Sequence, residues 1–350
     1  MSPDPDGNAE YGSRPAPAFT KEDGRLIFSY DSETVYVEPW GDNALRIRAS
    51  CLAAIPERDW AITEKPGSSK PDIQIQPRSA TITHGKIKAD ISRHGKIVIS
   101  NVQTGKVLLE EYARHRLDVL DPKCSSLRIQ PREWKPRLGS ADYHLTMRFE
   151  SQDPDERIYG MGQYQQPFMN LKGADLELAQ RNSQATVPFA VSSLGYGLLW
   201  NNPGVGRAVF SKLTTTFEAY STDTLDYWVV AGDSPGEIVR AYTGVTGRVP
   251  KMPEYGLGFW QCKLRYQTQE ELLEVAREYK RRNLPIDLIV CDYFHWPNQG
   301  DWKFDPTFWP DPGESIPSYP PMLSGTSPPG SHVLTDKRRC HGCRAQGDEH

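Results

Sequence analysis

The sequence lacks the features that mark membrane proteins and nucleic-acid-binding proteins. No apolar run reaches the ~20 residues that a membrane-spanning helix needs. Basic residues are not in excess, because 41 Lys and Arg stand against 45 Asp and Glu, which makes the formal net charge −4. A nucleic-acid-binding protein needs a basic surface to neutralise phosphates. We therefore expect neither a membrane nor a nucleic acid as a partner.

Features of secreted proteins are also missing. The acidic, proline-rich start Met1–Asp6 has neither the basic nor the apolar region of a signal peptide. No Asn-x-Ser/Thr glycosylation site occurs. Six cysteines in 350 residues are too few for a disulfide scaffold. These absences predict an intracellular protein with reduced thiols, and we expect a cytoplasmic location.

Aromatic residues, by contrast, are plentiful: nine Trp, sixteen Tyr and eleven Phe. Side chains of this kind have to be buried, which predicts a folded, globular protein. From about Leu26 to Val249, short runs alternate between apolar and polar residues and are separated by turn residues, as in antiparallel sheets. We predict a mainly β protein, with residues 1–24 a disordered leader and residues 25–250 an N-terminal antiparallel β-sandwich domain. The clearest predicted strands are Thr34–Val37, Leu45–Arg48, Ile97–Ile99, Val107–Leu109, His144–Phe149, Phe189–Val191, Leu198–Trp200 and Leu225–Val230.

Two helices are predicted from their capping residues. Ser234 with Glu237 three positions later forms a capping-box pattern, and a short helix should follow. Thr268 and Glu271 repeat that pattern at the start of a second helix. Asn283 should end this second helix, because asparagine tolerates the left-handed conformation of a C-terminal cap.

The second helix lies between two predicted strands. Gly256–Cys262 is predicted to be a short buried strand, and the apolar run Pro285–Asp292 is typical of a strand buried on both faces. Strand, helix and strand with short connections form a βαβ unit, whose strands are parallel. We assign this unit to residues 251–312. Cys262 and Cys291 fall on its two strands and are expected to be buried thiols rather than a redox pair.

The last 38 residues, 313–350, differ again in composition. Pro, Gly and Ser supply 15 of the 38, and no periodic apolar pattern occurs. Such a segment cannot bury enough apolar surface to offset its ordering entropy, so we predict a disordered tail. Cys340 and Cys343 with His341 resemble half of a zinc site. Structural zinc needs four ligands, so we predict no metal site.

The most informative stretch follows the second predicted strand. Asp292 stands at the carboxyl end of that strand, where active sites form in parallel α/β folds, and an aromatic-rich loop follows it up to Asp305. Carboxylates bind sugar hydroxyls and aromatic rings cover sugar faces, which favours a carbohydrate pocket. The alternative interpretation is that Asp292 caps the loop and the aromatic residues pack beneath it. The spacing alone leaves both interpretations open.

Residues from about Glu156 to Pro312 resemble glycoside hydrolase family 31, which contains α-glucosidases and α-xylosidases. Any single matching segment is weak, but their order and spacing together are specific. The matching segments are Arg157–Gln163, Arg181–Ser183, Val187–Phe189, Gly195–Gly197, Asp226–Trp228, Pro253–Gln261, Asp292–Trp296 and Asp305 with Phe308 and Pro310.

The resemblance implies a galactose-mutarotase-like sandwich, then a (β/α)8 barrel, and a retaining hydrolysis of α-linked carbohydrate without a cofactor. It implies that Asp292 bonds sugar hydroxyls, and that Tyr293 and Phe294 lie near the C5 substituent, where bulk would favour xylose over glucose. It also implies that the loop with Arg181 and Asn182 leans over the barrel mouth. The substrate-binding residues that we derive from it are Asp292, Tyr293, Phe294, Trp296, Trp260, Arg181 and Asn182.

Chain length limits this expectation. A (β/α)8 barrel takes about 250 residues, whereas only 100 residues follow Pro250. A retaining glycosidase needs two carboxylates ~5–5.5 Å apart, and in this family later barrel strands carry them. We therefore assign no catalytic residue and expect an incomplete barrel, no activity of this chain alone and weak or absent sugar binding. We interpret the tail as read-through intron or shifted-frame sequence of a truncated gene product. The alternative is a non-catalytic sandwich that binds carbohydrate or a partner.

Overall fold

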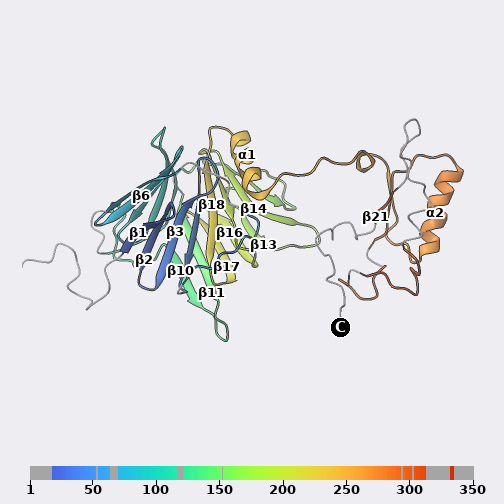
Figure 1. The fold of residues 1–350 in the computed structure, drawn as a ribbon, viewed down its shortest axis with the longest axis horizontal. Helices are drawn as coiled ribbons and strands as arrows, with labels where there is room; N and C mark the ends of the chain where they lie inside the picture. Colours follow the sequence, from blue (N-terminus) through green and yellow to red (C-terminus); the bar gives the residue numbers. More distant parts are fainter. Residues whose placement is uncertain are drawn as a thin grey trace, which may run out of the picture. The chain divides into compact units, whose positions relative to one another are not determined.

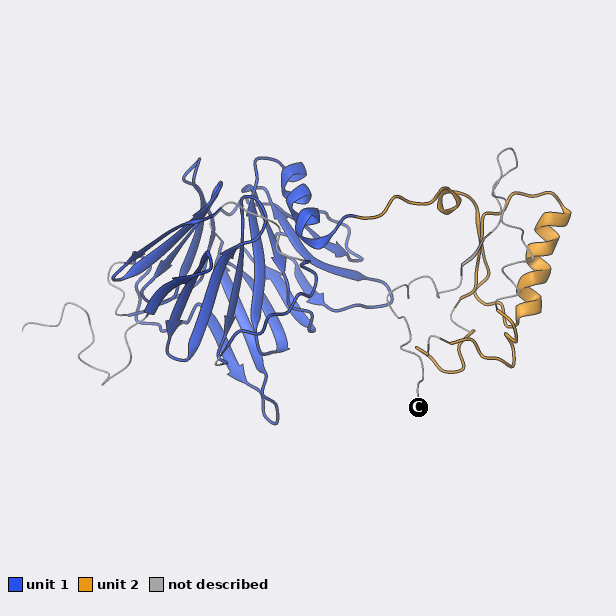
Figure 2. Ribbon diagram, in the orientation of Figure 1, with its two compact units in different colours: residues 1–248 blue, residues 249–350 orange. Residues whose placement is uncertain are grey.

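The computed structural model describes residues 18–52, 54–63, 70–116, 121–151, 153–292, 295–301 and 303–312, and the backbone of 332–334. It divides the chain into two compact units, Met1–Arg248 and Val249–His350 (Figure 2). The first unit consists of antiparallel sheets and one helix, and the second is a small parallel α/β unit (Figure 1). The mainly β fold class predicted from the sequence is confirmed.

Three sheets build the first unit. An eight-stranded sheet has the order β1-β2-β3-β4-β18-β15-β14-β12, and two five-stranded sheets have the orders β10-β11-β17-β16-β13 and β5-β6-β7-β8-β9. The strands of the eight-stranded sheet are β1 Ala18–Glu22, β2 Arg25–Tyr30, β3 Glu33–Pro39, β4 Ala44–Ser50, β12 Ile158–Gln163, β14 Ala185–Ser192, β15 Tyr196–Trp200 and β18 Leu225–Ala231. The other two sheets contain β5 Asp72–Gln76, β6 Ser79–His84, β7 Ile87–Ser92, β8 Ile97–Asn101, β9 Val107–Glu110, β10 Arg132–Pro136, β11 Tyr143–Glu150, β13 Asp175–Leu178, β16 Gly206–Phe210 and β17 Thr214–Thr222.

The core lies where the sheets face each other. Along β4 the side chains of Leu45 and Ile47 enter this core and are completely buried. The Trp200 ring on β15 stacks on the Phe217 ring on β17, with centroids 5.3 Å apart, which joins the eight-stranded sheet to a five-stranded one. The period-two alternation in the sequence therefore reflects this two-layer packing.

The predicted leader ends earlier than expected. Residues 18–22 form β1, which pairs with β2, so the prediction of a disordered segment over 1–24 is wrong for these residues. Asp23 and Gly24 both have positive φ (48° and 77°), which suits a tight two-residue hairpin turn. The Phe19 ring packs on Phe28, and this contact gives β1 its place on the core. Residues 1–17 lie outside the described residues.

Helix α1, Pro235–Thr246, covers the outer face of the eight-stranded sheet. Its predicted cap is confirmed: Ser234 Oγ accepts a hydrogen bond from Glu237 N at 3.3 Å, and Glu237 accepts one from Asp233 N at 3.0 Å. The helix buries Ile238 against the sheet and stacks Tyr242 on Phe189, with ring centroids 4.0 Å apart.

The second unit has three parallel strands and one long helix. Its elements are the 3-10 helix η2 Glu254–Leu257, β19 Trp260–Cys262, helix α2 Gln269–Arg281, β20 Leu288–Val290 and β21 His332–Leu334. The order β19-β20-β21 confirms the predicted parallel βαβ unit. The capping predictions for α2 are also confirmed, because Thr268 accepts a hydrogen bond from Glu271 N and Asn283 has a φ of 52°.

Two expectations for the second unit are wrong. The predicted buried strand Gly256–Cys262 is a 3-10 turn followed by the three-residue β19, in which Trp260 and Cys262 are exposed. The reason is that β19 pairs only with β20 in this sheet and so lies at its edge. In the predicted disordered tail, His332–Leu334 form β21, whose backbone pairs with the open edge of β20. The rest of residues 313–350 lies outside the described residues.

Candidate functional site

The loop after β20 carries the first of the predicted site residues. Asp292 comes two residues after Val290, the last residue of this strand, and is partly buried. Its carbonyl oxygen lies 2.9 Å from Nδ1 of His295, a contact that closes the turn of the loop. Tyr293 and Phe294, the two residues between them, lie outside the described residues. The structure thus places Asp292 at the carboxyl end of a parallel strand, as the sequence predicts.

Aromatic residues pack around His295, which is itself buried. Its ring lies 5.0 Å from Phe304 and 5.4 Å from Trp296, between ring centroids, and Trp309 completes the cluster at 6.5 Å. Trp309 is buried with the apolar face of α2. Phe304 and Trp309 therefore pack against the buried residues of α2 and hold the loop in place. Trp296 also contacts His295 but stays partly exposed.

Trp260 belongs to the same sheet but lies at a different end of it. Its ring is 45% exposed, and its Nε1 donates a hydrogen bond to the Gly256 carbonyl at 3.1 Å. The parallel register sets Trp260 beside Leu288, whereas Asp292 comes four residues after Leu288, beyond the far end of β20. The structure does not bring Trp260 and Asp292 to one end of the sheet.

Arg181 and Asn182 lie in the first unit, on the exposed loop between β13 and β14. Arg181 forms a bidentate ion pair with Glu177, with Nε–Oε2 at 2.9 Å and Nη2–Oε1 at 2.5 Å. The Tyr164 hydroxyl donates a hydrogen bond to the Glu177 carbonyl and shares a second one with the Thr186 hydroxyl, both 2.9 Å, and these bonds fasten the base of the loop. These contacts hold Arg181 beside the strand ends and leave Asn182 exposed at the tip.

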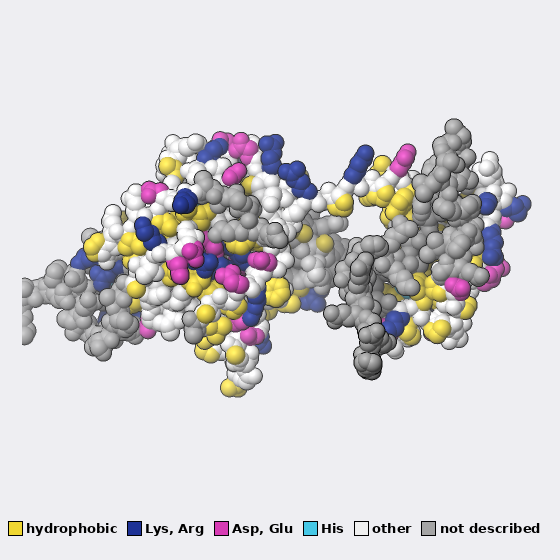
Figure 3. Space-filling view, in the orientation of Figure 1, with side chains coloured by type: hydrophobic (Ala, Val, Ile, Leu, Met, Phe, Trp, Pro, Cys, Tyr) yellow, Lys and Arg dark blue, Asp and Glu magenta, His cyan; other side chains and the backbone are white. Residues whose placement is uncertain are grey.

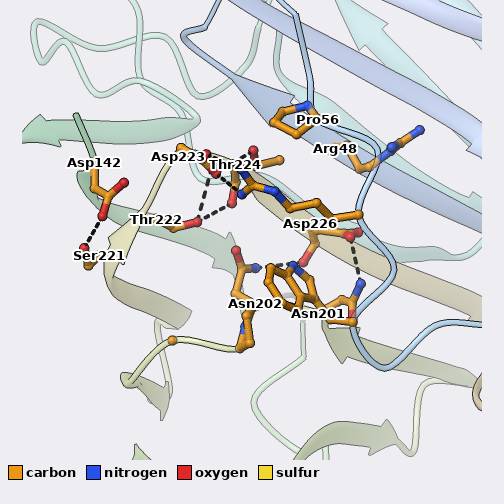
Figure 4. A pocket seen from close by; sticks show the side chains of 14 residues that line it. Arg48, Pro56, Asp142, Asn201, Asn202, Ser221, Thr222, Asp223, Thr224 and Asp226 are labelled. Atoms are coloured by element: carbon orange, nitrogen blue, oxygen red, sulfur yellow. Dashed lines mark hydrogen bonds and ion pairs between the residues drawn. The ribbon is translucent and has the colours of Figure 1, made fainter. Parts of the chain in front are cut away.

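A second group of polar residues surrounds a pocket of about 430 Å³ in the first unit, which we call the Trp60 pocket (Figure 4). The sequence analysis did not predict it. The side chains that matter most for its chemistry are Trp60, Arg58, Asp142, Asn202, Asp223 and Asp226. The sequence does contain one indication of a buried polar site: arginines occupy the alternate positions 46 and 48 of β4, between apolar residues.

Buried charges form the floor beneath this pocket. Arg46 binds the Asp226 carboxylate through Nε (3.1 Å) and Nη2 (2.7 Å), and both side chains are almost fully buried. Asn201 donates a further hydrogen bond to Asp226 at 2.7 Å. At the rim, burial alone would raise the pKa of Asp223, but hydrogen bonds from Arg58 and Thr224 outweigh burial and hold this pKa below its ordinary value. Asp223 is therefore ionised and paired at neutral pH.

The described residues contain neither a metal-binding cluster nor a membrane-spanning helix. Within the described residues, no group of three or more His, Cys, Asp or Glu side chains could hold a metal ion. Cys340, His341 and Cys343 lie outside those residues. No helix in the described segments is long and apolar enough to cross a membrane. The cytoplasmic location remains a prediction.

Charged side chains are mixed on the surface. On the face of the first unit that Figure 3 shows, Lys and Arg lie interspersed with Asp and Glu rather than in one basic area. This distribution agrees with the net charge of −4. It offers no extended positive surface to a phosphate backbone on that face.

Comparison with known proteins connects these elements to a family. Residues 34–206 match the family model described as "Glycosyl hydrolase 31 N-terminal galactose mutarotase-like domain", and residues 249–320 match "Glycosyl hydrolases family 31 TIM-barrel domain". The two matches follow each other in the order that the resemblance implied. The chain belongs to glycosyl hydrolase family 31.

Relatives within family 31 cover most of this chain. A protein of Pseudescherichia vulneris named "Uncharacterized family 31 glucosidase ORF2" is 48% identical over 295 residues, which are 82% of this chain and 55% of that protein. Alpha-xylosidase A of Aspergillus niger is 31% identical over 82% of this chain and 40% of its own length. The chain therefore spans about half the length of these family 31 relatives.

Solved structures agree with the sequence matches. The crystal structure of a family 31 α-xylosidase from a soil metagenome, complexed with xylose, superposes with a TM-score of 0.77 and 51% identity. The superposition covers 85% of this chain and 45% of that protein. The β-sandwich and the start of a TIM barrel are thus common to this chain and its family 31 relatives.

Proposed function

We propose that this chain supplies the sandwich and the first barrel strands of an α-glycosidase that acts on α-xylosides or α-glucosides with retention of configuration. The observation that carries the proposal is Asp292 at the carboxyl end of β20, within the segment that matches the family's TIM-barrel domain. Relatives named as α-xylosidases support xylose as the sugar, because they match across 82% and 50% of this chain.

The site residues take their roles from this placement. In the proposal, the Asp292 carboxylate bonds the hydroxyls of the sugar that is cleaved, and Tyr293 and Phe294 restrict the space at its C5 substituent. Trp296 is the proposed aromatic surface of this site, whereas Trp260, at the other end of the sheet, takes no part in it.

Hydrolysis of the glycosidic bond needs catalytic carboxylates in addition to these substrate-binding residues. A retaining glycosidase uses a nucleophile and an acid/base whose carboxyl groups are ~5–5.5 Å apart. In the proposal these groups come from barrel strands beyond the two that enclose α2, so the 350-residue chain alone does not hydrolyse its substrate. The non-catalytic alternative, a sandwich that binds carbohydrate, is supported separately by the Trp60 pocket.

Two measurements test the proposal. The purified 350-residue chain should not release p-nitrophenol from aryl α-xyloside or α-glucoside, with α-xylosidase A of Aspergillus niger as the active reference. A chimera that joins residues 1–312 of this chain to the remaining part of the Pseudescherichia vulneris relative should be active. Measurable turnover by the 350-residue chain, or a folded chimera without turnover on either substrate, would contradict the proposal.

Asp292 is tested within that chimera. Asp292→Ala should lower kcat/KM roughly 10- to 150-fold, because a hydrogen bond to a charged group contributes about 1.5–3 kcal/mol. Asp301→Ala is the matched control, since Asp301 lies on the same loop and, among the described residues, its carboxylate has only a 3.9 Å ion pair with Lys303. Equal effects of the two substitutions would remove Asp292 from the substrate site.

A further inference from the structure

We propose that the Trp60 pocket of the first unit binds neutral oligosaccharide, with a sugar ring stacked on Trp60 and its hydroxyls bonded by Asn202 and Asp142. This binding site goes beyond the proposed hydrolysis and does not depend on it. Four features of the pocket carry the proposal: a fixed aromatic surface, directed acceptors, balanced charge and a continuation of the groove.

The first feature is the position of Trp60. Its ring is 54% exposed, although the loop that bears it is tied down on both sides. Arg46 donates hydrogen bonds to Asp59 (3.1 Å) and to the Arg58 carbonyl (2.8 Å), and Ala61 N donates to Asn201 Oδ1 at 3.2 Å. An exposed indole on a fixed backbone binds with little loss of conformational entropy. Its flat apolar face suits the C–H face of a pyranose.

The second feature is a pair of hydrogen-bond acceptors in the lining of the same pocket. Asn202 donates through Nδ2 to the Asp226 carbonyl at 2.8 Å, which orients the amide, and Figure 4 shows its Oδ1 directed away from Asp226. Asp142 accepts a hydrogen bond from Ser221 through Oδ2 at 2.6 Å, which leaves Oδ1 as a second acceptor. Asn202 is almost fully buried, so its amide has one orientation. Two fixed acceptors match the donor hydroxyls of a sugar.

The third feature is charge balance. The lining contains two guanidinium groups, of Arg48 and Arg58, and three carboxylates, of Asp142, Asp223 and Asp226. Both guanidinium groups are already paired: Arg58 binds Asp223 at 2.8 and 2.9 Å, and Arg48 binds Glu57 at 2.7 Å. An anionic ligand would have to displace one of these paired carboxylates, whereas a neutral polyol bonds the same groups without displacing a counter-ion.

The fourth feature is a second pocket, of about 510 Å³, whose lining also includes Trp60. It shares Trp60, Asn202 and Pro203 with the first pocket, and its own lining includes the apolar side chains of Leu178 and Val205. Trp60 therefore borders both a polar pocket and a more apolar one. The combined groove has room for more than one sugar unit, so affinity should rise from monosaccharide to trisaccharide.

The test uses the full 350-residue chain labelled with 5-fluorotryptophan. Maltotriose is the first probe, and xylose and glucose are the monosaccharide probes. The Trp60→Phe variant assigns the fluorine resonance of Trp60 among the nine tryptophans. We expect maltotriose to shift this resonance in a saturable manner, and xylose or glucose to need higher concentrations.

Two variants then test whether maltotriose binds at this groove rather than elsewhere on the chain. Trp60→Ala should weaken maltotriose binding about tenfold, measured by calorimetry, because the stacked ring is lost. Phe168→Ala is the matched control, since Phe168 is an aromatic residue of the same unit, is 50% exposed and does not line the pocket. Circular dichroism of both variants checks that the sandwich stays folded.

Three outcomes would overturn the proposal: binding of equal strength in Trp60→Ala and the unchanged chain, a Trp60 resonance that does not respond to maltotriose, or a preference for glucuronate over glucose. The Asp292→Ala variant distinguishes sugar binding at the Trp60 pocket from the proposed hydrolysis site. Maltotriose should still shift the Trp60 resonance in that variant. A shift that Asp292→Ala abolishes would assign the bound sugar to the second unit instead.

Discussion

Arg46 on β4 and Asp226 on β18 form a bidentate ion pair between residues that are 180 positions apart in the sequence. The strands are neighbours in the eight-stranded sheet, and the pair lies on the face opposite the main core. The same guanidinium group reaches the loop of Trp60 through Asp59 and the Arg58 carbonyl. One buried arginine thus connects sheet pairing to the geometry of the Trp60 pocket.

Removing the charge of Asp226 should therefore destabilise the first unit strongly. Asp226→Asn removes the buried bidentate partner of Arg46 and leaves the guanidinium with only the exposed Asp59 carboxylate among the described residues, so the loss should approach the about 3–5 kcal/mol of unfolding free energy that a broken buried pair costs. Asp223→Asn is the matched control, because the Arg58–Asp223 pair is partly exposed and such pairs contribute about 0–1 kcal/mol. Urea unfolding followed by tryptophan fluorescence measures both. Equal losses in the two variants would show that Arg46 finds another partner.

His94 should make stability depend on pH. Burial and, after it, the neighbouring His115 lower the pKa of His94 from its ordinary 6.5 to about 4, and the two rings stack with centroids 4.0 Å apart. In the unfolded chain His94 binds a proton below pH 6.5, whereas in the folded chain it does so only below about pH 4. The free energy of unfolding therefore falls as the pH drops from 6.5 to 4. Partial exposure of the ring reduces the effect to about 1 kcal/mol.

The measurement for His94 is the unfolding free energy at a series of pH values for the unchanged chain and for His94→Gln. The variant should show a flatter curve between pH 6.5 and pH 4, since it has no proton to gain there. A parallel decline in both proteins would assign the acid sensitivity to other groups.

Cys262 and Cys291 should differ in reactivity, against the expectation of two buried thiols. Burial, with a smaller contribution from the Asp292 charge, raises the pKa of Cys291 to about 12, whereas Cys262 is exposed on β19. The thiolate is the reactive form, so at pH 8 iodoacetamide should modify Cys262 well before Cys291. Peptide-resolved mass spectrometry of a labelling time course measures the two rates. Similar rates would mean that the end of β20 opens readily.

The contact between α1 and the sheet should be intolerant of added volume at Gly197. A Cβ at this position would lie 2.6 Å from Ile238 Cγ2 and 2.9 Å from the Phe189 ring. Gly197→Ala should cost about 1–3 kcal/mol through overpacking. Gly244→Ala, within α1 and with nothing within 4 Å of its added Cβ, should instead stabilise by up to about 1 kcal/mol. Thermal unfolding of the two variants checks the opposite signs.

Strands and caps could be predicted because their causes are local. The alternation in Leu45–Arg48 and His144–Phe149 records which side chains face the core, and Ser234 and Thr268 bond the backbone only three residues away. The errors at β1, β19 and β21 are in short strands at sheet edges. There the pairing with a neighbouring strand, rather than the local composition, decides whether a strand forms.

The candidate sites divide in the same way. The position of Asp292 could be predicted because the end of a parallel strand is visible in the sequence, and its role in binding substrate stays a prediction. The Trp60 pocket could not be predicted, because Trp60, Asp142, Asn202 and Asp223 come from four separate segments. The pairing of β4, β18 and β15 brings Trp60, Asn202 and Asp223 together, and the pairing of β11 with β17 in the other sheet adds Asp142.

The sequence by itself determined the alternating strands, the helix caps, the parallel βαβ unit and the membership of family 31, because each depends on neighbouring residues or on a motif in fixed order. The tertiary structure decided which charges are buried and which tryptophan stays exposed. Those properties depend on contacts between residues as far apart as Arg46 and Asp226, and such contacts exist only once the sheets have assembled.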